Sequence, residues 1–302
     1  MKHPGEIAAL ITAMFWTITA LSFEAASKRI GSMVVNLLRL IVGFAFLSIF
    51  AWIYRGYLFP VDATPQAWMI LIISGLIGFT FGDLCLFQSF VVVGARISML
   101  LMALAPPFTA VISWLFLGER MSSLGLIGMM VTITGIALVV LKRENRPVES
   151  SSRRKVRFSY PVWGILLGLG GALGQAAGLV LSKYGMKEYD AFASAQIRVI
   201  AGIAGFSILF FILGLWKNTF RALSDRKALG QLSLGAFFGP FLGVSFSLIA
   251  VQHANMGIAA TIMAIVPVLI IPPSVILFKE KVTLKEVAGA ILAVGGVALF
   301  FL

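Results

Sequence analysis

Residues 105–138, APPFTAVISWLFLGERMSSLGLIGMMVTITGIAL, occur a second time in altered form at residues 266–299, VPVLIIPPSVILFKEKVTLKEVAGAILAVGGVAL. The two copies align without a gap at an offset of 161 residues, which pairs Pro106 with Pro267, Glu119 with Glu280, Gly128 with Gly289 and Gly135 with Gly296. We expect the two glutamates to be structural, because an acid at the start of a helix favours the helix dipole.

The repeat extends toward the N-terminal part of each half. The offset of 161 also relates Gly78 to Gly239 and Gly82 to Gly243, and an offset of 159 relates Gly5 to Gly164, Arg39 to Arg198 and Gly43 to Gly202. The chain therefore consists of two related halves.

The composition indicates a membrane protein with many spans. The 302 residues are 60% hydrophobic and 12% charged, whereas a soluble domain has about 25% charged residues. The mean hydropathy is +1.00. Such a chain has too little polar surface to cover a soluble globule, so we expect it to lie in a lipid bilayer.

Ten apolar runs approach the roughly 20 residues that a helix needs to cross a bilayer. They are residues 6–24, 34–54, 67–90, 97–117, 123–141, 161–182, 192–215, 229–252, 256–278 and 284–302. Backbone in lipid must satisfy its own hydrogen bonds, and none of the runs alternates as a barrel strand does, so all should be helices. The first run could be taken for a signal peptide, but its match in the second half favours a retained helix.

A polar segment divides the ten spans five and five. Residues 142–157 carry seven Lys or Arg, and we expect a first repeat at 1–141, a basic linker at 142–160 and a second repeat at 161–302. Because five is odd, the second repeat must enter the membrane from the opposite side. The predicted fold is an all-α integral membrane protein of two inverted five-helix repeats, the usual construction of secondary transporters.

The two copies of the quoted stretch resemble the drug/metabolite transporter superfamily, and specifically its EamA-type ten-helix members. The proline, the segment Leu117–Arg120 and the glycine-rich closing helix carry the resemblance, together with the first helix and its tryptophan, Trp16. The resemblance implies proton- or gradient-linked movement of small organic metabolites such as amino acids, often export. It also implies a central cavity lined by both repeats.

The helices that face this cavity in the family supply the candidate lining residues, which are Trp16, Asp83, Gln88, Met102, Gln175 and Met263. For the two methionines, lipid contact or packing in the core is the plainer interpretation. A passive channel, or a receptor or accessory protein that transports nothing, is the alternative function. The inverted repeat argues against a receptor, because a receptor needs no two opposed halves.

Asp83 is an acid in the middle of an apolar span, where a charge costs roughly 2.5–3.5 kcal/mol on insertion scales. Its counterpart in the second half is Val244, so the fold does not require an acid there. Three interpretations stay open: Asp83 binds a substrate or a proton, it forms a structural ion pair with Arg39 or Arg198, or it merely lies near the end of its helix.

Arg39 and Arg198 are matched between the halves and lie one or two turns inside their helices. The match suggests a shared role in the fold, such as snorkelling toward the interface or binding helix-end carbonyls. The alternative is contact with an anionic group of a substrate, since the guanidinium fork suits a carboxylate.

Several classes of function are not expected. The net charge of +12 comes from basic residues in the connections, which membrane loops explain better than a nucleic-acid interface does. The sequence contains neither HExxH, GxSxG nor a Walker lysine motif, and it has only two histidines and one cysteine. We therefore expect no enzyme activity, no metal site, no cofactor and no ATP-driven pumping. The expected partners are a small-molecule substrate and the lipid bilayer; a homodimer is compatible but not required.

The basic residues also predict an orientation in the cell (inner) membrane. The connections opposite the termini carry 18 Lys or Arg, and the side of the termini carries six. The positive-inside rule places the more basic side in the cytoplasm. It therefore predicts that both termini lie outside the cytoplasm, although members of the resembling family usually have them inside.

Overall fold

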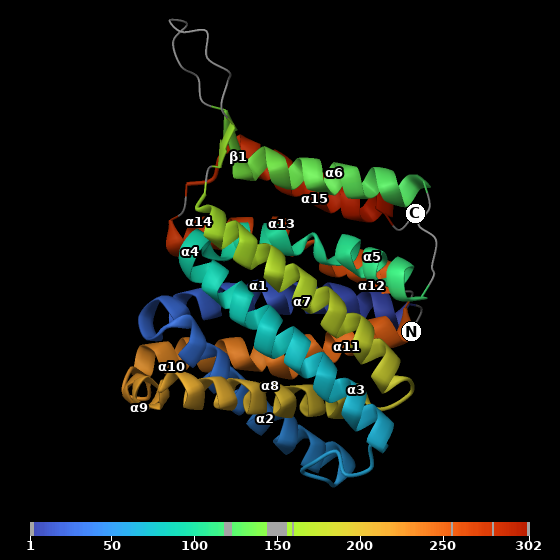
Figure 1. Cartoon of the computed structure of the whole chain (residues 1–302), viewed down its shortest axis with the longest axis vertical. Coiled ribbons are helices and arrows are strands. Elements are labelled where there is room, and N and C mark those ends of the chain that lie inside the picture. Colours follow the sequence, from blue (N-terminus) through green and yellow to red (C-terminus); the bar gives the residue numbers. More distant parts are fainter. Residues whose placement is uncertain are drawn as a thin grey trace, which may run out of the picture.

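The computed structural model describes residues 3–117, 123–143, 156–158, 160–254, 256–279 and 281–300. Glu119, Glu280 and most of the expected linker lie outside these residues. The described chain is almost wholly helical (Figure 1). Both ends of the chain lie at one edge of the molecule, and the β1 hairpin lies at the opposite edge.

The first half is made of seven helical elements in the described residues. Its elements are α1 (Pro4–Ile30), α2 (Ser32–Arg55), α3 (Pro65–Gly75), the π-helix η1 (Leu76–Gly82), α4 (Asp83–Met102), α5 (Ala105–Leu117) and α6 (Ser123–Val140). A third span runs through α3, η1 and the first part of α4. Gly94 ends that span, because its backbone turns out of the helix with φ 84° and ψ 158°, a conformation that glycine adopts without steric cost.

The second half repeats this order. Its elements are α7 (Val162–Met186), α8 (Ala191–Leu213), the short α9 (Trp216–Ala222), α10 (Arg226–Ala236), the π-helix η2 (Phe237–Gly243), α11 (Val244–His253), α12 (Met256–Met263), α13 (Val266–Leu269), α14 (Ile271–Phe278) and α15 (Leu284–Phe300). Within the described residues, six helices are long and apolar enough to cross a membrane, and residues 127–140 and 266–277 form shorter apolar helices.

The fourth and ninth spans are not the continuous helices that the sequence analysis expects over 97–117 and 256–278. The helix is interrupted at residues 103–104 and again at 264–265, positions that are 161 apart. Each interruption ends two residues before Pro106 or Pro267. Proline has no backbone N–H, and its ring clashes with the carbonyl of the residue four positions earlier, so it breaks a helix at this place.

The polar segment between the halves begins and ends in a short hairpin that the sequence analysis did not foresee. Strand β1 (Leu141–Arg143) pairs antiparallel with β2 (Val156–Phe158), and Lys142 lies opposite Arg157. Three-residue strands are too short for the alternation of polar and apolar residues to be recognised in a sequence. The hairpin brings the two ends of the segment together at the edge of the molecule (Figure 1).

The closing helices of the halves, α6 and α15, pack against each other at one end of the molecule (Figure 1). A Cβ added at Gly135 would lie 2.5 Å from the backbone nitrogen of Ala293, and one added at Gly296 would lie 2.4 Å from that of Thr132. Thr132 and Ala293 are themselves 161 residues apart, and the contacts run in opposite directions along the two helices. The halves are therefore inverted repeats, and the matched glycines are where their backbones meet.

Candidate substrate cavity

A cavity of about 140 Å³ lies between the two halves. The first half contributes residues of α1, α2, η1, α4 and α5, and the second half contributes residues of α7, α8, η2 and α11–α13. This volume is below the roughly 300–1000 Å³ of common ligand pockets, so the cavity in this conformation suits only a small solute.

Two π-helices border the cavity, and they are equivalent in the repeat, since η1 begins at Leu76 and η2 at Phe237. Glycines allow a second helix to approach each of them closely. A Cβ added at Gly82 would lie 3.2 Å from the backbone of Gly174 in α7, and one at Gly243 would lie 3.0 Å from the Trp16 ring in α1. Single-turn π segments inside helices are frequent at functional sites.

Asp83 follows η1 directly and holds the polar centre of the cavity. Its side chain is buried, and its carboxylate forms an ion pair with the Nη2 group of Arg39. The Nε2 group of Gln175 donates to the second carboxylate oxygen over 2.8 Å. Asn36 donates to the backbone oxygen of Asp83 over 3.1 Å and accepts from the Nε group of Arg39. The acid therefore connects α2 and α4 of the first repeat with α7 of the second.

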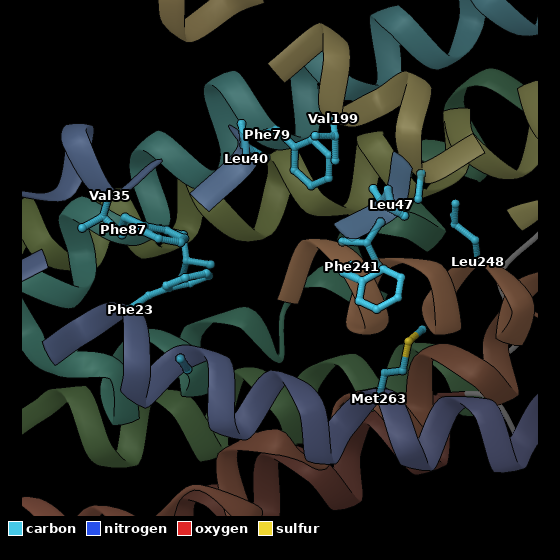
Figure 2. Close-up of a cluster of buried hydrophobic side chains, with 14 of the residues drawn as sticks. Phe23, Val35, Leu40, Leu47, Phe79, Phe87, Val199, Phe241, Leu248 and Met263 are labelled. Carbon is cyan, nitrogen blue, oxygen red and sulfur yellow. The ribbon is translucent and has the colours of Figure 1, made fainter. Parts of the chain in front are cut away.

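The two matched arginines approach the same aromatic ring. The Cζ atoms of Arg39 and Arg198 lie 5.6 and 4.8 Å from the ring centroid of Phe79, which belongs to η1. Arg39 also lies 4.6 Å from the ring of Phe87, and Phe23 packs beside Phe87 at a centroid distance of 5.0 Å (Figure 2). Aromatic faces attract desolvated cations, so the rings help to hold both guanidiniums inside the membrane.

The structure brings most of the expected residues together. Seven of them line this one cavity: Trp16, Arg39, Asp83, Met102, Gln175, Arg198 and Met263.

Gln88 is not among the cavity-lining residues. Its Oε1 atom accepts a hydrogen bond from Ser32 over 2.6 Å, and it borders a separate groove near the turn between α1 and α2. Five residues along a helix rotate a side chain by about 500°, or 140° away from the starting face. Asp83 and Gln88 therefore cannot share the cavity face.

The aromatic walls of the cavity and Asn36 are not among the residues predicted from the sequence. Phe23, Phe79, Phe87 and Phe90 all line the cavity. Part of the signal was present, because Asp83 and Phe87 are four residues apart and therefore lie on the same helix face. The chain contains 25 phenylalanines, and this abundance hid the few that surround the acid.

The profile of the EamA-like transporter family matches the chain twice, over residues 3–141 and again over residues 162–302. The chain belongs to the EamA-like transporter family. It is an all-α membrane protein built from two copies of this family's unit, and its family consists of transporters rather than enzymes.

Relatives agree with this assignment. The chain is 26% identical over 242 residues to the uncharacterized transporter YvbV of Bacillus subtilis, covering 78% of this chain and 72% of YvbV. It is 24% identical over 269 residues to the uncharacterized transporter YdfC of the same species, covering 88% and 80%. It is 30% identical over 158 residues to solute carrier family 35 member G1 of Mus musculus, covering 51% of this chain and 40% of the carrier.

A solved crystal structure has the same fold. It superposes with a TM-score of 0.67 at 17% sequence identity, over 99% of this chain and 96% of the other. The agreement over nearly both entire chains concerns the architecture alone.

Proposed function

We propose that the protein is a secondary active transporter that moves small organic metabolites by alternating access. The observation that carries the proposal is the cavity between two inverted repeats, which is lined by residues of both and includes the buried Arg39–Asp83 ion pair. Inverted-repeat transporters bind their substrate near the middle of the bilayer and expose it to each side in turn.

The moving bodies in this proposal are the repeats, residues 1–141 and 161–302, joined by the basic linker at 142–160. The interrupted spans before Pro106 and Pro267 and the two π-helices are the places where each repeat can bend. The glycine-lined contact of η1 with α7 is smooth enough to slide, because backbone meets backbone there.

Asp83 is the proposed coupling residue. Its hydrogen bond to Gln175 crosses from one repeat to the other, so protonation of the carboxylate or displacement by a substrate weakens a direct tie between the moving bodies. Export of amino acids or related solutes, driven by a proton or other ion gradient, is the working hypothesis. A buried carboxylate in a transporter span supports it, since such acids serve as proton relays.

The proposed location is the cell (inner) membrane, with both termini outside the cytoplasm because of the uneven distribution of Lys and Arg. The described cavity is lined by the two halves of one chain. One copy is therefore sufficient in this proposal, and a homodimer is compatible with it.

A thermal-shift screen of the purified protein against pools of metabolites tests the proposal. We expect at least one metabolite to raise the melting temperature and to be taken up by vesicles that contain the protein. Vesicles with Asp83→Asn should contain as much inserted protein and show little gradient-driven uptake. Unchanged gradient-driven uptake in that variant would remove Asp83 from the mechanism.

A further inference from the structure

The charged residues that line the central cavity do not balance. Among the lining residues, Arg39 and Arg198 are basic and Asp83 alone is acidic, which leaves one positive charge in excess. All three side chains are buried. Because burial removes the screening that water supplies, this excess charge acts at short range on whatever enters the cavity.

Both carboxylate oxygens of Asp83 already have partners within the protein. One carboxylate oxygen faces Arg39 and the other accepts from Gln175 over 2.8 Å. Arg39 in turn donates from its Nε atom to Asn36 over 3.1 Å. The first repeat thus satisfies its own arginine with its own acid.

Arg198 has no such arrangement. It is 3% exposed, and its Nε atom has no hydrogen-bond partner within the described residues. Its guanidinium rests on the Phe79 ring at 4.8 Å. The repeat explains the difference, because Val244 occupies the position in the second half that Asp83 occupies in the first. The second repeat has kept the arginine and lacks the acid.

A buried cationic group without a hydrogen-bond partner is costly, and native proteins usually pair it. Within the cavity, an incoming ligand can supply the missing partner. A carboxylate fits, since a guanidinium presents its N–H groups as a planar fork that matches two carboxylate oxygens.

The remaining walls define the rest of the ligand. Aromatic and methionine side chains line much of the same cavity, among them Trp16, Phe23, Phe87, Phe90 and Met263. Such walls favour an apolar or aromatic body and offer little to a sugar or a polyol.

We propose that the transported solute is an organic carboxylate with an apolar or aromatic body, whose carboxylate pairs with Arg198. This inference rests on the proposed transport function and narrows it. Arg198 acts as a substrate-binding residue, and the Arg39–Asp83 pair remains intact beside it.

Three probes with one body and different charge test the proposal: 3-phenylpropionate, 3-phenylpropionamide and 3-phenylpropylamine. Their binding to the full-length protein in lipid nanodiscs is measured by calorimetry. We expect the anion to bind, and the amide and the amine to bind at least about tenfold more weakly, since a charge-assisted hydrogen bond is about twice as strong as a neutral one.

Two variants and one control separate binding from folding. Arg198→Gln should weaken anion binding about tenfold or more, and Arg198→Lys should restore part of it. The control Lys217→Gln removes an exposed positive charge on α9 outside the cavity. It should change neither anion binding nor the melting temperature. The melting temperature of Arg198→Gln should change little, because the variant loses the contact with the Phe79 ring but also removes a buried charge whose Nε atom has no hydrogen-bond partner within the described residues.

Equal or tighter binding of the amide or the amine, anion binding that survives Arg198→Gln, or failure of all three probes to bind would overturn the inference. A lower melting temperature of Arg198→Gln together with unchanged anion binding would assign Arg198 a purely structural role. Uptake of pooled metabolites by wild-type vesicles is measured in parallel. If wild-type vesicles take up a metabolite although one of these results is obtained, the proposed transport function still holds and only the inference about Arg198 is wrong. If they take up none, the proposed transport function is wrong as well.

Discussion

Replacing Asp83 by Asn, alone and together with Arg39→Gln, separates the two roles open to this acid. The side chains of Arg39 and Asp83 are 4% and 5% exposed, so water does not screen the charge that remains after one partner is removed. The introduced asparagine can still accept the hydrogen bond from Gln175, but its amide N–H groups then face the donors of Arg39. We expect Asp83→Asn to lower the free energy of unfolding by about 3–5 kcal/mol, as breaking one side of a buried ion pair does.

The double variant removes both charges, and we expect its stability to return to within about 1 kcal/mol of the wild type. Stability is measured by thermal or denaturant unfolding in lipid nanodiscs, and transport is measured in vesicles. Asp62→Asn, which replaces an acid outside the cavity that pairs with Arg55, serves as the control. If Asp83 couples transport, the double variant is stable and uncoupled. Full gradient-driven transport in the double variant, or wild-type stability of Asp83→Asn, would refute the reasoning.

Three further outcomes are expected. Gly296→Ala should destabilise the protein by about 1–3 kcal/mol, because its Cβ would lie 2.4 Å from the backbone nitrogen of Thr132. The control Gly295→Ala places a Cβ that meets nothing within 4 Å, so it should be neutral in the same unfolding assay. Equal effects of the two variants would contradict the packing of α6 on α15. The hydrogen bond from the backbone N–H of Ala228 is the main factor that holds the pKa of the Asp225 carboxyl below its usual value. The contribution of this carboxylate to stability is therefore present at neutral pH and is lost as the pH falls through the lowered pKa. Asp225→Asn should lower the melting temperature at pH 7, and its difference from the wild type should shrink as the pH is lowered. A reporter fused to the C-terminus should be active only outside the cytoplasm; cytoplasmic activity would reverse the orientation.

The architecture could be predicted from the sequence because a bilayer requires apolar runs of a set length and because the two halves keep matching residues at a constant offset. Apolar runs of span length predict helices, and an odd number of spans per repeat implies inversion. The matched glycines, Gly135 and Gly296, predict close packing, and the structure places them where α6 and α15 meet.

The site was accessible only in part. Asp83 stands out because a charge in an apolar run is rare. Hydropathy does not distinguish a cavity-lining phenylalanine from one that faces lipid, so Phe79 gave no signal. The partner of Asp83 depends on how α2 and α4 cross, which a sequence without an alignment does not specify. Gln88 was placed in the cavity because its helix faces the cavity, without regard to the direction in which position 88 points around the helix axis.

Counterflow in vesicles tests alternating access most directly. Vesicles containing the wild-type protein are loaded with an excess of an unlabelled metabolite chosen by the thermal-shift screen, and are diluted into a trace of the labelled compound. A carrier whose single site faces one side at a time predicts a transient rise of internal label above its external concentration, absent from protein-free vesicles. Label that rises only to equality with the outside would indicate a channel and contradict the account.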